Sequence, residues 1–157
     1  MAMSVPVLKT FYVYLTSGCN CACRHCWFVP ERQKGAEDEV ALDPEVLRHA
    51  IEQALPLGLA AIKWTGGEPT LNDGLVDLCQ EIKRLGYAIK LDTNGSRPER
   101  LRRLLDRKLV DYVAMDLKAP LEGYQPFCTH PRIRERLSQS IRLIMQAAPA
   151  YEFRTTC

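Results

Sequence analysis

Residues 60–95 have the sequence AAIKWTGGEPTLNDGLVDLCQEIKRLGYAIKLDTNG and contain a complete strand–helix–strand unit. The apolar run Ala60 to Trp64 is broken by Gly66 and Gly67, which predicts a buried strand that enters a loop. A second apolar run, Tyr87 to Leu91, predicts another strand. Between the two runs, apolar side chains recur at helical spacing, at Leu75, Leu78, Cys79, Ile82 and Leu85. The segment therefore predicts two strands that are joined by a helix.

The same alternation continues on both sides of this unit. Three further apolar runs predict strands at Phe11 to Leu15, Val110 to Met115 and Tyr151 to Thr156. Three further helices are predicted to begin at prolines, which are favoured at the first helical position: Pro44, Pro98 and Pro131. Strict alternation of strands and helices predicts an α/β fold with a parallel sheet and right-handed crossovers.

The strand ends help to choose between two architectures that this alternation leaves open, a doubly wound sheet and a barrel segment. A polar residue marks the end of every predicted strand: Ser17, Thr65, Asp92, Asp116 and Arg154. In a (β/α) barrel the carboxyl ends of all strands open on one face, where active sites lie. We therefore favour a partial (β/α) barrel, with residues 1–157 as one domain.

The composition is that of an ordinary globular protein. Hydrophobic residues make up 46% of the chain and the formal net charge is +2, which does not favour a nucleic-acid partner. No apolar run approaches the ~18 residues that a membrane span requires. The segment Met1 to Thr10 lacks the long apolar block and the cleavage site of a signal peptide. These features predict a cytoplasmic protein without a membrane or nucleic-acid partner.

Four of the seven cysteines lie between residues 19 and 26. In a reducing compartment such close cysteines indicate a metal site rather than disulfides. Cys19, Cys23 and Cys26 offer three thiolates from one loop, whereas a 4Fe–4S cluster usually takes four. One iron would then keep an open position for a substrate or cofactor. Cys21 and His25 leave a zinc site as an alternative, although no second ligand pair follows downstream.

A Gly-Gly-Glu segment, Thr65 to Pro69, stands at the end of the strand predicted at residues 60–64. Gly66 and Gly67 let the backbone approach a ligand closely because neither carries a Cβ. Glu68 offers an acceptor for an ammonium group. Because the cysteine loop follows the neighbouring predicted strand, the two segments together indicate one cofactor site.

These two segments resemble those of the radical S-adenosylmethionine (SAM) superfamily. The resemblance implies that the three spaced cysteines bind a 4Fe–4S cluster and that SAM chelates its fourth iron. It also implies that Gly66, Gly67 and Glu68 contact the SAM amino group. In that family an electron from the cluster cleaves SAM to methionine and a 5′-deoxyadenosyl radical, which abstracts hydrogen from the substrate. His25 stands at a position that is usually aromatic in the family, and it is expected to stack near adenine.

Three later segments resemble glycyl-radical-enzyme activases, and most closely the activating protein of anaerobic ribonucleoside-triphosphate reductase: Leu91 to Gly95, Val113 to Pro120 and Tyr151 to Thr156. The resemblance implies a glycyl radical enzyme as the protein substrate. It also implies reduced flavodoxin or ferredoxin as the electron donor.

The same resemblance supplies further cofactor-binding residues. Asp92 and Thr93 are expected near the methionyl end of SAM, with Asn94 in the same segment. Asp116 and Lys118 form an Asp-x-Lys element in which the lysine suits the SAM carboxylate. Arg154 is expected near SAM or near the glycine loop of the partner enzyme.

Two other functions remain open. Residues 23–27, Cys-Arg-His-Cys-Trp, are similar to loops of radical SAM enzymes that modify peptides and proteins. The substrate would then be a peptide or a small molecule such as a deazapurine precursor. A non-catalytic iron–sulfur or zinc-binding protein is the other alternative, against which the Gly-Gly-Glu and Asp-x-Lys elements argue. A radical SAM core normally has six strands, so we expect this chain, which ends in the fifth, to be an incomplete core.

Overall fold

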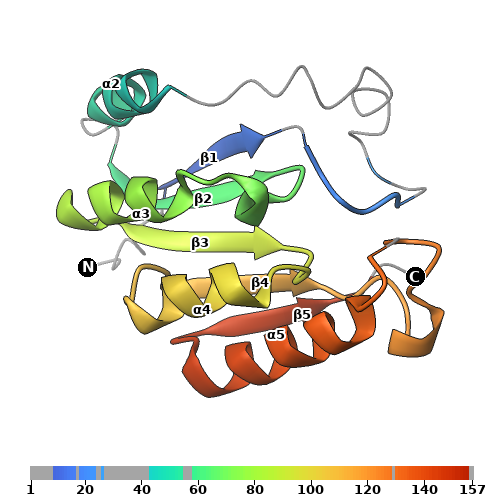
Figure 1. Ribbon diagram of the computed structural model, residues 1–157. Helices are drawn as coiled ribbons and strands as arrows, with labels where there is room; N and C mark the ends of the chain where they lie inside the picture. Colours follow the sequence, from blue (N-terminus) through green and yellow to red (C-terminus); the bar gives the residue numbers. More distant parts are fainter. Residues whose placement is uncertain are drawn as a thin grey trace, which may run out of the picture.

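The computed structural model describes residues 9–16, 18–23, 26, 43–54, 58–128 and 130–155. They form a five-stranded parallel sheet in the order β1-β2-β3-β4-β5 (Figure 1). The strands are β1 (Lys9–Thr16), β2 (Leu59–Gly66), β3 (Ala88–Thr93), β4 (Tyr112–Asp116) and β5 (Tyr151–Arg154). Each strand therefore pairs with the next one along the chain.

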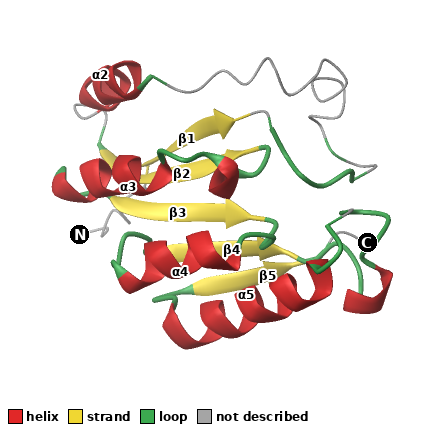
Figure 2. Cartoon of the chain, viewed as in Figure 1, coloured by secondary structure: helices red, strands yellow, loops and turns green. Residues whose placement is uncertain are grey.

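Helices connect successive strands: α2 (Pro44–Ala54), α3 (Leu75–Arg84), α4 (Pro98–Asp106) and α5 (Ile133–Ala147). Because the strand order never reverses, crossovers of one hand place their helices on one face of the sheet. Figure 2 shows α3, α4 and α5 in front of the same face. A doubly wound sheet would instead carry helices on both faces. The prediction of an α/β fold with a partial barrel is confirmed.

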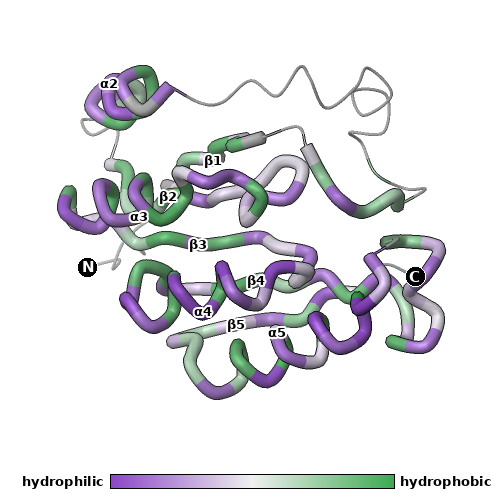
Figure 3. Tube along the Cα trace, in the orientation of Figure 1, coloured by the Kyte–Doolittle hydropathy of each residue, from purple (hydrophilic) through white to green (hydrophobic). Residues whose placement is uncertain are grey.

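The core lies between this face of the sheet and the helices. Alternate strand residues point into it and are buried: Val13, Leu15, Ile62, Trp64, Ile89, Leu91, Val113 and Met115. Figure 3 shows hydrophobic and hydrophilic residues alternating along α4 and α5, as expected for helices that bury one side. Each fully buried leucine or isoleucine contributes about 1.5–3 kcal/mol. The core therefore holds the strand ends in fixed positions.

The opposite face of the sheet is polar because side chains alternate along each strand. On this face, four residues of neighbouring strands lie opposite one another in register: Tyr12, Lys63, Lys90 and Tyr112. The Lys63 Nζ lies 2.8 Å from Asp92 Oδ2, and the Lys90 Nζ lies 3.0 Å from Glu152 Oε1. Charged groups on this face are thus paired with one another.

The observed strands differ from the predicted ones mainly at their ends. β2 extends to Gly66, beyond the predicted end at Trp64, and β3 extends to Thr93, beyond Leu91. These additional residues are largely polar and face a pocket rather than the apolar core. An interpretation based on hydrophobicity therefore ends these strands too early.

Two short 3-10 helices, η3 (Pro69–Leu71) and η4 (Leu121–Gly123), were not predicted, because three residues are too few to show a helical pattern. The predicted start of α2 is confirmed: the Glu45 backbone N–H donates to Asp43 Oδ1 at 2.8 Å. Across the described ranges, none of the helices combines the length and the apolar character that a membrane crossing needs.

Candidate functional site

A pocket of about 270 Å³ lies at the carboxyl ends of the strands. All predicted site residues that the structure describes line it: Cys19, Cys23, Cys26, Gly66, Gly67, Glu68, Asp92, Thr93, Asn94, Asp116, Lys118 and Arg154. Cys21, Thr65 and Pro69 also contribute to the lining. His25, which was predicted to stack near adenine, lies outside the described residues. Segments from five different parts of the chain thus meet at one edge of the sheet.

The end of β2 turns sharply into the pocket at Gly66. This residue has a φ of +113°, a conformation that side chains with a Cβ rarely adopt. Two residues later, the Glu68 N–H donates to the carbonyl of Gly18 at 2.8 Å. This hydrogen bond fastens the Gly-Gly-Glu segment to the start of the cysteine loop.

Glu68 is fully buried beneath this turn, and both of its carboxylate oxygens accept hydrogen bonds from the protein. Oε1 accepts from the Thr70 N–H at 3.1 Å, from the Thr70 hydroxyl, and from the Thr93 hydroxyl at 2.7 Å. Oε2 accepts from the Asn94 N–H at 2.6 Å. Burial raises the pKa of Glu68, and these hydrogen bonds oppose that rise. The carboxylate therefore joins the ends of β2 and β3.

The cysteine loop is held at its middle as well as at its start. The Ala22 N–H donates to the carbonyl of Phe127 at 2.7 Å, and the Cys26 N–H donates to the carbonyl of Cys23 at 3.2 Å. Cys23 is buried, whereas Cys19 and Cys26 are partly exposed. Within the described part of the chain, no three Cys, His, Asp or Glu side chains are grouped for a single metal ion.

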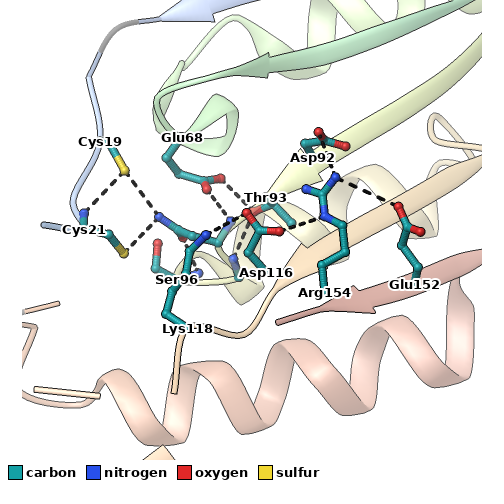
Figure 4. A network of polar contacts seen from close by, with 12 residues as sticks. Cys19, Cys21, Glu68, Asp92, Thr93, Ser96, Asp116, Lys118, Glu152 and Arg154 are labelled. Atoms are coloured by element: carbon teal, nitrogen blue, oxygen red, sulfur yellow. Dashed lines mark hydrogen bonds and ion pairs between the residues drawn. The ribbon is translucent and has the colours of Figure 1, made fainter. Parts of the chain in front are cut away.

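Charged side chains from β3, β4 and β5 line the other side of the pocket (Figure 4). Asp116 lies between two cations: its Oδ2 is 2.8 Å from Lys118 Nζ and its Oδ1 is 2.8 Å from Arg154 Nε. Arg154 also reaches Asp92, with its Nη1 3.3 Å from Oδ2. Burial works to lower the pKa of Arg154, but Asp116 and Asp92 raise it above its ordinary value.

Asp92 has one oxygen that the rest of the network does not use. Its Oδ2 lies 2.8 Å from Lys63 Nζ, in addition to the contact with Arg154. Its Oδ1 is buried and has no hydrogen-bond partner among the described residues. A buried carboxylate oxygen without a donor is costly, so a ligand that supplies an N–H group would stabilise this site.

Tyr124 holds the backbone of the Asp-x-Lys element and was not predicted from the sequence. This fully buried residue accepts a hydrogen bond from the Lys118 N–H at 2.9 Å, and its hydroxyl donates to the carbonyl of Asp116 at 3.3 Å. Burial raises its pKa to about 12. Tyr124 lies in a loop without a periodic pattern, so the sequence offers little signal for its role.

The fold and this site define a radical SAM protein. The chain belongs to the radical SAM superfamily, whose family model matches residues 13–154. It is 32% identical over 157 residues to a proposed glycyl-radical enzyme activating enzyme of Methanocaldococcus jannaschii, a match that covers 94% of this chain and 61% of that protein. It is 30% identical over 105 residues to a proposed GTP 3′,8-cyclase of Thermococcus kodakarensis, covering 67% of this chain and 33% of the cyclase.

The fold is shared with solved structures as well. Streptococcus suis SuiB, in its structure bound to S-adenosylmethionine, superimposes with a TM-score of 0.72 at 15% identity, over 93% of this chain and 33% of that chain. The chain thus spans about three fifths of the M. jannaschii relative and smaller shares of the other two proteins.

The superfamily uses a 4Fe–4S cluster and SAM, so the predicted cofactors are confirmed. The donor set of the pocket fits both groups. Cys19, Cys23 and Cys26 bring three thiols from one loop to the pocket, as a cluster with one open iron requires. Across from them lie the ammonium group of Lys118 and the unused oxygen of Asp92, which suit the carboxylate and the amino group of a zwitterion.

Proposed function

We propose that Cys19, Cys23 and Cys26 hold the 4Fe–4S cluster of a radical SAM enzyme, and that SAM binds beside it in the 270 Å³ pocket. This proposal rests on one observation: all three cysteines line the same pocket as the Gly-Gly-Glu and Asp-x-Lys elements. When bound, the reduced cluster and SAM supply a radical that removes a hydrogen atom from the substrate. The chain itself binds and orients these groups and limits the access of water.

The charged residues suit the methionyl end of SAM. Lys118 offers an ammonium group to the SAM carboxylate, and Arg154 adds a second positive charge on the same side. The unused oxygen of Asp92 offers an acceptor to the SAM amino group. Glu68 lines the same pocket and stays a predicted contact of the SAM amino group. Because its oxygens accept from Thr70, Thr93 and Asn94, it also positions the loop ends.

The substrate that we favour is a glycine of a glycyl radical enzyme, which makes the chain an activase. The identity to the M. jannaschii protein, which carries that name, spans 94% of this chain and supports the proposal. A reduced flavodoxin or ferredoxin would supply the electron. A nucleotide substrate is the second candidate, because the T. kodakarensis relative is named as a cyclase that acts on GTP.

The test is anaerobic reconstitution of the chain with iron and sulfide, followed by dithionite reduction and an assay for 5′-deoxyadenosine. Cys19→Ala, Cys23→Ala and Cys26→Ala should each abolish product, while Cys21→Ala, in the same loop, should retain it. An EPR doublet on an added anaerobic ribonucleotide reductase would support the activase, and a cyclised product from GTP would support the second candidate. Product that is independent of the three cysteines would contradict the proposal.

A further inference from the structure

We propose that Asn94 is a positioning residue that tunes the cluster by donating a hydrogen bond from its side-chain amide to the sulfur of Cys19. This inference rests on the proposed function, since it takes Cys19 as a cluster ligand. It gives Asn94 a role toward the cluster, beyond the general expectation that its segment lies near SAM.

The side chain of Asn94 is fixed in one orientation. The residue is only 6% exposed, and its backbone N–H is committed to Glu68 Oε2 at 2.6 Å. Its side-chain carbonyl accepts from the Ser96 N–H at 2.9 Å. Because the carbonyl end is occupied by a backbone donor, the amide nitrogen must point the other way, toward the cysteine loop.

The amide nitrogen carries two hydrogens and faces three acceptors of this loop, which share them. It lies 3.0 Å from Asn20 Oδ1, 3.2 Å from Cys21 Sγ and 3.7 Å from Cys19 Sγ. Cys19 Sγ also accepts from the Cys21 N–H at 3.4 Å. Figure 4 shows Cys19 and Cys21 facing the segment that carries Thr93 and Ser96. The sulfur of Cys19 is therefore approached by two N–H donors.

These donors would act on the charge of the cluster. A thiolate that binds iron is negative, and hydrogen bonds to an ionised acceptor are stronger than those to a neutral one. Hydrogen bonds to cluster sulfurs are one of the factors that set the reduction potential. Reduction adds one negative charge, which an N–H donor stabilises, so the amide of Asn94 should raise the potential.

The same contacts link the two halves of the site. Glu68 fixes the backbone of Asn94, and the side chain of Asn94 then reaches Cys19. The Gly-Gly-Glu segment would thus act on the cluster indirectly, through Asn94. Residues that hydrogen-bond to metal ligands commonly orient those ligands in this way.

The experiment is an EPR-monitored redox titration of the reconstituted cluster without SAM, in the wild type, Asn94→Ala and Asn94→Asp. Both substitutions keep the backbone N–H that bonds to Glu68. Asn94→Ala should shift the midpoint potential to a more negative value, and Asn94→Asp, which adds a negative charge, should shift it further. Asn72→Ala, at an asparagine outside this pocket whose side chain accepts from the Gly74 N–H, is the control, and its potential should equal that of the wild type.

Two results would overturn the inference alone. One is a wild-type potential in both Asn94 variants, and the other is a shift in Asn72→Ala as large as that in Asn94→Ala, which would show that the effect is not specific to Asn94. If both Asn94 variants fail to load iron while Asn72→Ala loads it, Asn94 serves cluster assembly, and the tuning role is wrong. A wild-type chain that loads no cluster would instead overturn the proposed function, and this inference with it.

Discussion

Arg154 Nε donates to Asp116 Oδ1 at 2.8 Å, so the side chain at the end of β5 is bound to the end of β4. The same guanidinium reaches Asp92 at the end of β3. One cation therefore holds the carboxylates of two other strands in place. It also offsets their negative charge beside the proposed SAM carboxylate, which would otherwise be repelled.

Arg154→Ala should weaken SAM binding by about tenfold, equivalent to ~1.4 kcal/mol. The reason is that Asp116 and Asp92 lose a shared partner and their charge is no longer balanced. Isothermal titration calorimetry of the reconstituted chain measures the effect. Arg134→Ala, an exposed position on α5, is the control and should bind like the wild type. Equal affinities in the two variants would show that Arg154 does not act on SAM.

Lys118→Gln should weaken the binding of SAM but not of decarboxylated SAM. We propose that Lys118 contacts the SAM carboxylate. Decarboxylated SAM lacks that carboxylate, so the substitution removes no contact from it. The same calorimetric experiment with both ligands gives a ratio of affinities for each protein. A ratio that is unchanged by the substitution would rule out the proposed pairing.

Glu68→Gln should lower the free energy of unfolding by about 2–3 kcal/mol, because a glutamine oxygen cannot replace two carboxylate oxygens that accept from Thr70, Thr93 and Asn94. Urea denaturation of both proteins tests this. The exposed Glu122→Gln serves as the control and should leave the midpoint unchanged.

Glu68 should also make stability depend on pH. Its pKa is higher in the folded chain than the ordinary value of 4.5, because of burial. Above pH 4.5 the folded state therefore holds more protons at this group than the unfolded state does, so the contribution of Glu68 to stability falls as the pH rises through its folded pKa. The difference between wild type and Glu68→Gln should shrink over this range. A difference that grows with pH would contradict the raised pKa.

Tyr124→Phe should cost about 1 kcal/mol and weaken SAM binding, since the Lys118 N–H and the Asp116 carbonyl lose their shared partner. Tyr87→Phe is a matched control because the Tyr87 hydroxyl is buried without a hydrogen-bond partner among the described residues. Removing that hydroxyl should leave stability equal or higher. Thermal denaturation and calorimetry measure both variants, and equal losses in both would contradict the role of Tyr124.

Much of the site could be predicted from the sequence because its residues follow strands. Asp92, Asp116 and Arg154 each stand where an apolar run ends, and in a parallel sheet such positions meet at one edge. The cysteine spacing and the Gly-Gly-Glu segment are visible in the sequence itself, and the family resemblance supplied the roles expected of them. Short motifs of this kind can be recognised in the sequence without knowledge of the tertiary structure.

The contacts that hold the site together could not be predicted in this way. Thr70 and Tyr124 act through hydrogen bonds whose partners depend on how two loops turn, and loop geometry leaves no periodic pattern. The burial of Glu68 and its hydrogen bonds from Thr93 and Asn94 depend on β2 and β3 lying side by side, which no local sequence pattern shows.

The strand order has a consequence for biosynthesis. The ribosome releases the cysteine loop before Arg154, and because the spatial strand order follows the chain order, the sheet can extend from β1 towards β5 as the chain emerges. At about 5–20 residues per second, the cysteines precede Arg154 by about 6–27 seconds. A nascent chain would therefore expose the thiols that we propose bind iron before the opposite wall of the pocket exists. Delivery of the cluster should be timed to follow translation of β5.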